Sequence, residues 1–178
     1  MSLSVGRSLS ERYHAATAYT PSSIAKHPRL DFSRQPSPFK SWYQARRVEL
    51  PGGSGTPPDP TPGPFDLERL GRLLFHSYGV TLVREFPGMS MHFRAAPSAG
   101  GLYPTELYVA VRDIDGVPDG ILDYSAPDHS LVVCWEGDFW SDLERFTFGH
   151  PAIADARAVL IGTAVYERSA WRYRDRAY

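Results

Sequence analysis

Residues 94–111 read RAAPSAGGLYPTELYVAV and join a loop of small residues to an apolar stretch. The loop holds Gly100 and Gly101, which lack a side chain, so the backbone there can approach a flat ligand with amides free to donate. Residues 107–111 have the length and composition of a buried strand. A Pro-Ser-Ala-Gly-Gly stretch is also typical of an ordinary surface loop, so the residues alone leave both interpretations open.

A helix is predicted before this loop, over residues 65–79. Apolar residues recur there three or four positions apart, which is the spacing of one helix face; they are Leu67, Leu70, Leu74 and Tyr78. Asp66 is suited to cap the start of the helix and Gly79 its end.

The elements predicted after the loop mix hairpins and helices. Strands at 121–124 and 131–135 form a hairpin around residues 128–129, with the glycines of Asp115-Gly116 and Asp119-Gly120 supplying turns. A short helix follows at 138–146, then an apolar strand at 158–166 and the start of another helix at 169–178. We expect the helix to turn three side chains inward, namely Phe139, Leu143 and Phe146. Because the central hairpin is antiparallel, the order predicts an α+β fold.

Composition restricts the classes of function. The 178 residues suit one domain, and a hydrophobic fraction of 42% with 22% charged residues is typical of a globular chain. A net charge of -1 disfavours binding to nucleic-acid phosphates. No apolar run is long enough to cross a bilayer and the N-terminus lacks the apolar segment of a signal peptide, so we expect a cytoplasmic protein without membrane contact.

Neither a disulfide nor a metal site is expected. Cys134 is the sole cysteine and lies in an apolar stretch typical of a packed strand. The 6 histidines lack ligand spacing. Motifs for acyl transfer and for P-loop nucleotide binding are also missing.

The proline and glycine residues divide the chain. Residues 51–64 have almost no apolar side chain and predict a linker or long loop. Residues 1–50 are interpreted as a leader whose aromatic side chains pack on the domain, and 65–178 as the N-terminal part of that domain.

Several motifs together resemble SagB-type dehydrogenases, which form thiazoles and oxazoles within the FMN-dependent nitroreductase-like superfamily. RAAPSAGGLYPTELYV at 94–109 is similar to their flavin loop. Further similar stretches follow the same order along the chain: ERYHAAT at 11–17, QPSPFK at 35–40, LLFHSYGV at 73–80, DGILDY at 119–124 and VYERSAWRY at 165–173.

The resemblance implies an FMN-binding α+β fold, with a mixed or antiparallel sheet and flanking helices, in which two like domains pair and build flavin sites at their interface. The partner would be a second copy or a homologous nitroreductase-like domain. The residues placed along the flavin ring would be Pro97, Ser98, Ala99, Gly100 and Gly101. Arg94 would bind an anionic part of the cofactor; the alternative for Arg94 is a surface ion pair.

Three features depart from the family pattern. The basic Arg-Ser-Arg segment that binds the FMN phosphate has no equivalent before the first helix, and Arg46-Arg47 is a distant substitute. Arg172 and Tyr173 fall on a catalytic Lys-Tyr pair; Tyr173 can exchange a proton, but an arginine cannot act as a base. The alternative is that Trp171 and Tyr173 only pack a helix face. The family's later helix and C-terminal segment do not follow Tyr178, so the resemblance implies an incomplete fold.

Two functions therefore remain. The first is an FMN-dependent oxidoreductase acting on a peptide azoline or another small molecule. The second is a non-catalytic half-domain that pairs with a complete homologous domain.

Overall fold

The computed structural model describes residues 7–26, 29–53 and 63–177. The chain forms two compact units, each described by itself. One comprises the described residues up to Pro36 together with those from Tyr166 onward, and the other is Ser37–Val165. The second unit thus includes part of the segment expected to be a leader, while most of the linker lies outside the described residues.

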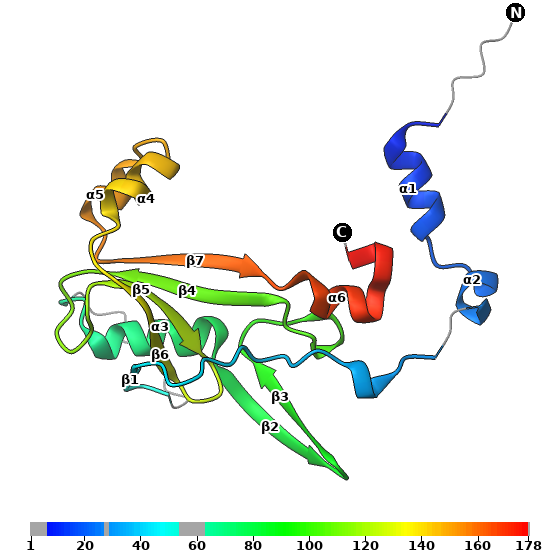
Figure 1. The fold of residues 1–178 in the computed structure, drawn as a ribbon, viewed down its shortest axis with the longest axis horizontal. Helices are drawn as coiled ribbons and strands as arrows, with labels where there is room; N and C mark the ends of the chain where they lie inside the picture. Colours follow the sequence, from blue (N-terminus) through cyan, green and yellow to red (C-terminus); the bar gives the residue numbers. More distant parts are fainter. Residues whose placement is uncertain (1–6, 27–28, 54–62, 178) are drawn as a thin grey trace, which may run out of the picture. The chain divides into compact units, whose positions relative to one another are not determined.

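The larger unit is built on an antiparallel five-stranded sheet in the order β1-β6-β5-β4-β7 (Figure 1). The strands are β1 Arg47–Glu49, β4 Thr105–Val111, β5 Gly120–Ser125, β6 Ser130–Glu136 and β7 Ala158–Ala164. The predicted central hairpin is therefore confirmed as β5 and β6. β1 spans three residues and was not expected from the sequence.

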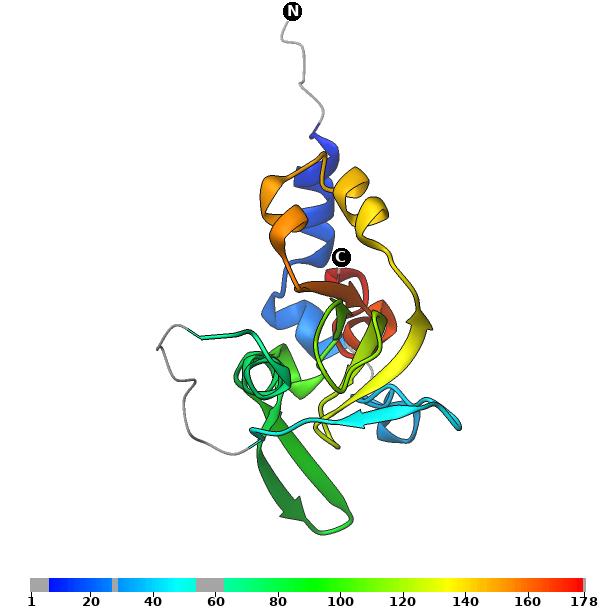
Figure 2. The same ribbon diagram turned by 90° about the vertical axis from the view of Figure 1, so that its left-hand side faces the viewer.

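Helix α3, Leu67–Tyr78, packs against one face of this sheet (Figure 2). Asp66 caps its start as expected, accepting a hydrogen bond from Arg69 N at 2.9 Å. Leu70 and Leu74 are fully buried. Gly79 ends the helix with a φ of -64°, so no left-handed residue is used there. Glycine is needed at that position because a Cβ would lie 2.6 Å from the Phe75 ring.

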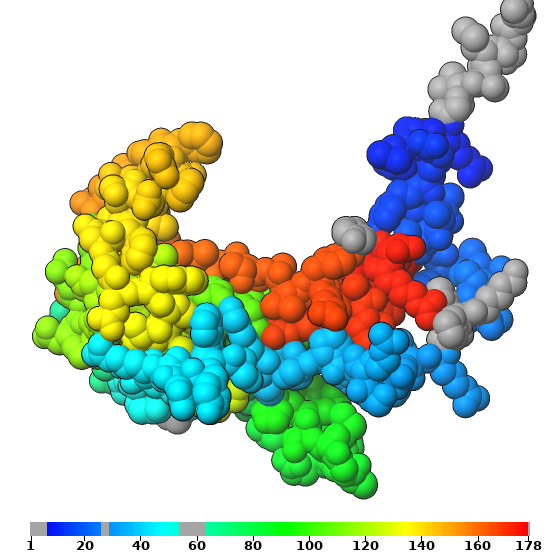
Figure 3. Space-filling view, viewed as in Figure 1, coloured from blue at the N-terminus to red at the C-terminus, as the bar shows by residue number. Residues whose placement is uncertain are grey.

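A separate hairpin of β2, Val80–Phe86, and β3, Met89–Arg94, follows α3 and was not predicted. It extends away from the five-stranded sheet (Figures 1 and 3). Its turn is Pro87-Gly88, where Gly88 has a φ of +81°. Several of its large apolar side chains are about half exposed: Leu82, Val83, Phe86 and Met89.

Two short helices connect β6 to β7: α4, Trp140–Phe146, and α5, Pro151–Asp155. The expectation for α4 was wrong in one respect, because Phe146 is 70% exposed. Trp140 is the buried residue instead. Its Nε1 donates to the Ile153 carbonyl at 2.9 Å, and the Arg112 guanidinium lies 4.4 Å from its ring centroid.

The smaller unit contains α1 Leu9–Thr17, α2 Pro21–Lys26, the 3-10 turn η1 Phe32–Arg34, α6 Tyr166–Tyr173 and the 3-10 turn η3 Arg174–Ala177. α6 begins three residues before the start expected from the sequence. The Ser8–Glu11 capping box starts α1. An N-terminal and a C-terminal segment contact each other in this unit. Trp171 Nε1 donates to the Asp31 carbonyl at 3.2 Å, and the Trp171 ring lies edge-on to Phe32.

No helix within the described part of the chain combines the length and the apolar character that crossing a bilayer requires. The cytoplasmic location stays a prediction.

Candidate functional site

The loop between β3 and β4 carries the residues expected to line a flavin. Pro97, Ala99 and Gly100 are exposed, while Ser98 and Gly101 are half-buried. Residues 99–101 form a short 3-10 turn, η2, with φ values of +67° at Gly100 and +65° at Gly101. A Cβ at Gly101 would meet no atom within 4 Å, so the space beside it is open. The loop therefore presents small residues and backbone at the surface of this unit.

Internal hydrogen bonds fix the shape of this loop. Ser98 Oγ accepts from Tyr103 N at 2.8 Å, and Gly101 N donates to the Ser98 carbonyl at 3.0 Å. Tyr103, which has a φ of +45°, returns its side chain to the start of the loop, where its hydroxyl accepts from Arg94 N at 3.0 Å. Such bonds hold the loop in one conformation before a ligand arrives, which lowers the entropic cost of binding.

Arg94 lies beneath the loop and is only 6% exposed, so the alternative of a surface ion pair is wrong. Its guanidinium lies 4.5 Å from the Tyr78 ring centroid, 4.8 Å from that of Tyr103 and 5.1 Å from that of Phe39. Nη2 also donates to the Pro38 carbonyl at 2.6 Å. Arg94 thus joins α3, the loop and residues 38–39, a role that its sequence position did not reveal.

Residues 37–46, which we call the strap, cross the face of the sheet opposite α3. Trp42 Nε1 donates to Asp123 Oδ2 at 2.6 Å, and Lys40 Nζ donates to the Tyr108 hydroxyl. Lys40 also lies over the Trp42 ring at 4.4 Å. Asp123 is 2% exposed, so its carboxylate is kept from water by the strap. Because Arg94 is bonded to the strap at Pro38, the strap supports the base of the loop.

The charges beneath the strap shift two pKa values. Partial burial acts to lower the pKa of Lys40, but its hydrogen bond to Tyr108 and the nearby Asp123 carboxylate together raise it above the usual value. Burial raises the pKa of the Cys134 thiol, and the Asp123 carboxylate acts in the same direction. Lys40 is therefore held as a cation and Cys134 as a neutral thiol, as expected for a packed strand residue.

The arginines considered for the FMN phosphate are engaged elsewhere. Arg46 Nη1 lies 2.9 Å from Glu136 Oε1, and Arg47 Nη1 lies 3.1 Å from Asp128 Oδ2. Both pairs lie where β1 meets β6 and the β5–β6 turn. Arg46 and Arg47 therefore form surface ion pairs with Glu136 and Asp128.

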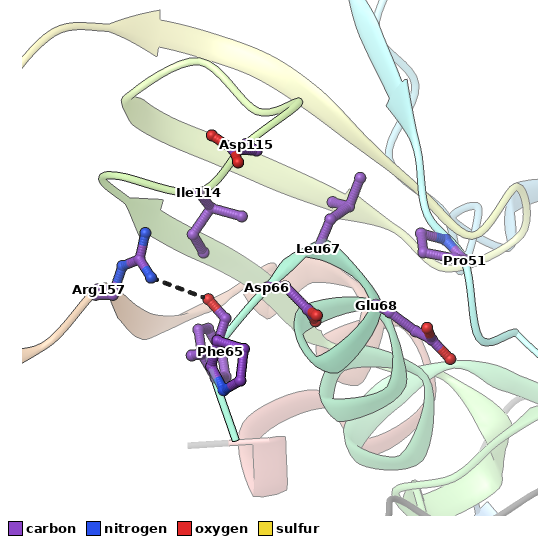
Figure 4. Close-up of a pocket in the computed structure, with 9 residues that line it drawn as sticks. Pro51, Phe65, Asp66, Leu67, Glu68, Ile114, Asp115 and Arg157 are labelled. Carbon is purple, nitrogen blue, oxygen red and sulfur yellow. Dashed lines mark hydrogen bonds between the residues drawn. The ribbon is translucent and has the colours of Figure 1, made fainter.

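A cavity of about 500 Å³ lies at the start of α3 (Figure 4). The described residues of its wall include the carboxylates of Asp66, Glu68 and Asp115 and one cation, Arg157, whose Nη1 donates to the Phe65 carbonyl at 3.4 Å. This excess of negative charge disfavours a phosphate-bearing ligand. The cavity is a poor candidate for the flavin site.

Arg172 and Tyr173 belong to the smaller unit, so they are described apart from the loop. Both lie at the end of α6, and the Arg172 guanidinium is 6.0 Å from the Tyr173 ring centroid. Tyr173 is half-buried and Arg172 is exposed. Across residues 7–26, 29–53 and 63–177, no three His, Cys, Asp or Glu side chains gather as metal ligands would.

Known proteins with similar sequence and structure point to one family. A protein of Methanocaldococcus jannaschii named as a putative nitroreductase is 38% identical over 115 residues, which cover 65% of this chain and 54% of that protein. A crystal structure of a putative nitroreductase from Anabaena variabilis superposes with a TM-score of 0.80 at 42% identity. The superposition covers 97% of this chain and 35% of the other.

No family model matches the chain. The chain spans about half the length of its curated relative and about a third of the crystallised one. The α+β fold with an antiparallel sheet and flanking helices, expected from the sequence, is confirmed by this structural match. In both sequence and fold, the chain is thus similar to proteins named as putative nitroreductases.

Proposed function

We propose that this chain forms the flavin-facing part of an FMN-dependent oxidoreductase of the SagB-type dehydrogenase group. The observation that carries the proposal is the preformed loop at 97–101, whose small residues, left-handed glycines and open space beside Gly101 suit the face and polar edge of a flat ring. The chain is similar in sequence and fold to proteins named as putative nitroreductases. Because the nitroreductase-like superfamily is FMN-dependent, this similarity supports FMN as the cofactor.

The residues present fit one part of FMN better than the other. The loop suits the ring, while Arg46 and Arg47, the distant substitutes for the family's phosphate-binding arginines, are paired with Glu136 and Asp128. Bound FMN would supply reversible two-electron transfer. In this proposal residues 97–101 lie along the ring with their small side chains and backbone, and Arg94 positions the loop from beneath.

The substrate class is also a proposal. Oxidation of an azoline to an azole in a peptide removes a hydride and a proton, and the resemblance to the SagB type favours such a substrate. Tyr173 is the proposed proton-exchanging group, because its phenol can both donate and accept a hydrogen bond. Arg172 stays protonated and is assigned to binding an anionic group.

Pairing with a second copy or with a homologous domain is proposed as well. The β2–β3 hairpin supports it, because the hairpin exposes Leu82, Val83, Phe86 and Met89 to solvent. Exposed apolar side chains gathered on one element are common at interaction surfaces of folded proteins. A pairing partner would bury them.

The test is retention of FMN by the purified chain. We expect the chain, after incubation with excess FMN and desalting, to keep a flavin absorbance spectrum, with its mass measured by light scattering in the same run. A folded protein that emerges colourless in every oligomeric state would contradict flavoenzyme function and favour a non-catalytic half-domain.

A matched pair of variants locates the ring. Gly101→Ala and Gly149→Ala each place a Cβ in open space at a positive φ, +65° and +69°. The backbone strain is therefore similar, but only Gly101 lies in the loop. We expect Gly101→Ala to weaken FMN binding about tenfold, equivalent to about 1.4 kcal/mol, and Gly149→Ala to leave it unchanged. Equal effects would exclude the loop as the ring site.

A further inference from the structure

The smaller unit contains a cavity whose wall includes Arg172 and Tyr173, the residues that the proposed function assigns to an anionic group and to proton exchange. Its volume is about 530 Å³, and its wall combines residues from α1, α2, α6 and η3. Pockets for small organic molecules commonly measure about 300 to 1,000 Å³. The cavity is therefore large enough for a ligand of two fused rings.

One side of the cavity is apolar. Ala16, Ala18, Ile24 and Leu30 contribute short or aliphatic side chains. Ile24 stays 59% exposed, and no residue of α1 is buried. Covering such side chains with an apolar group removes their surface from water, which stabilises the complex by about 25 cal/mol per Å². This side suits the body of a hydrophobic ligand.

The other side is cationic. Arg172, Arg174 and Arg176 alternate along the end of α6 and η3, and Asp175 is the one acid among the described residues of the wall. Arg176 is fixed in place, because its Nη1 donates to the Thr17 carbonyl at 2.9 Å and its guanidinium lies 4.4 Å from the Tyr19 ring centroid. The cations of the described wall thus all come from residues 172–176, whereas the wall residues from α1, α2 and the segments that follow these helices are uncharged.

We propose that this cavity binds an organic anion, with a flat apolar body against Ala16, Ala18 and Ile24 and one carboxylate at Arg172. The planar guanidinium fork matches a carboxylate with two parallel hydrogen bonds. The proposal stands on this cavity alone and does not require FMN.

The experiment measures binding of 2-naphthoate to the full chain, without flavin, by isothermal titration calorimetry. We expect 2-naphthoate to bind with 1:1 stoichiometry and the uncharged 2-naphthamide to bind about tenfold more weakly, since a hydrogen bond to a charged group is lost. Equal affinity for the acid and the amide would overturn the proposed ligand class.

Two variants test whether 2-naphthoate binds in this cavity. Arg172→Gln is expected to weaken 2-naphthoate binding about tenfold and to leave 2-naphthamide binding unchanged. Arg46→Gln is the control, because Arg46 is a surface arginine of the larger unit, paired with Glu136. If both variants bind 2-naphthoate equally well, the cavity is not the site. Because the naphthoate and naphthamide comparison uses the unaltered chain, it stays decisive even if a variant folds poorly.

Discussion

The two faces of the five-stranded sheet are covered by different chemistry. On one face, α3 packs Leu70 and Leu74 against Val109 and Leu122, all fully buried. On the other face, the strap covers Tyr108 and Asp123 through hydrogen bonds and a cation over an aromatic ring. Strand pairing places Tyr108 opposite Asp123 and Val109 opposite Leu122, so one strand serves both faces by alternation.

The difference separates the energetic roles of the two coverings. The α3 face gains stability from apolar area removed from water, which depends little on direction. The strap face gains stability from a few directed contacts to a buried carboxylate. These contacts are lost together when one partner is removed. We therefore expect the α3 face to set global stability and the strap to set the local order of the loop base.

The largest effect is expected for Leu74→Ala on the α3 face. Loss of a fully buried leucine should lower the free energy of unfolding by about 3 kcal/mol, through lost transfer energy and a residual cavity. Denaturant unfolding monitored by circular dichroism measures this change in the free energy of unfolding. Leu73→Ala is the control, because Leu73 is 38% exposed and should cost much less. Equal losses would show that α3 does not bury the face described.

A smaller effect is expected for Trp42→Phe in the strap. The substitution keeps the aromatic body and removes the Nε1 donor to Asp123, so the free energy of unfolding should fall by about 2 kcal/mol. Tyr43→Phe is the control, since Tyr43 is 89% exposed. Hydrogen exchange of the amides at 94–103 should also quicken in Trp42→Phe alone. Unchanged exchange there would separate the strap from the loop base.

The smallest effect concerns Cys134, which lies on the strap face. Because burial raises the pKa of its thiol, less thiolate is present at pH 8 than in the unfolded chain. We expect labelling by 5,5′-dithiobis(2-nitrobenzoic acid) to be about tenfold slower in the native protein than in urea. Trp42→Phe should speed the native reaction. A native rate equal to the unfolded one would mean that the strap does not shield this thiol.

Most elements of the larger unit could be predicted from the sequence because their patterns are local. α3 follows from apolar spacing and an acidic cap, and β4 to β7 from apolar runs between turns. The β2–β3 hairpin was missed, although Pro87-Gly88 between two strand-forming runs was the available signal. β1 could not be found from its three residues, because pairing with β6 alone makes them a strand.

The candidate site was only partly predictable. The loop at 97–101 could be found from its small residues, and its exposure agrees with a ligand-facing surface. The buried position of Arg94 could not be predicted, since an arginine between a strand and a loop is ordinarily exposed. Rings from α3, the loop and the strap meet around it, and these are distant in sequence.

The sequence by itself determined the α+β class, the apolar helix face and the loop of small residues at 97–101, because each depends on residues that are neighbours along the chain. Only the tertiary structure decided what covers the second face of the sheet, where Arg94 lies, and that Arg172 and Tyr173 share a cavity with α1 and α2. Those features depend on contacts between segments far apart in sequence, and no local pattern encodes such contacts.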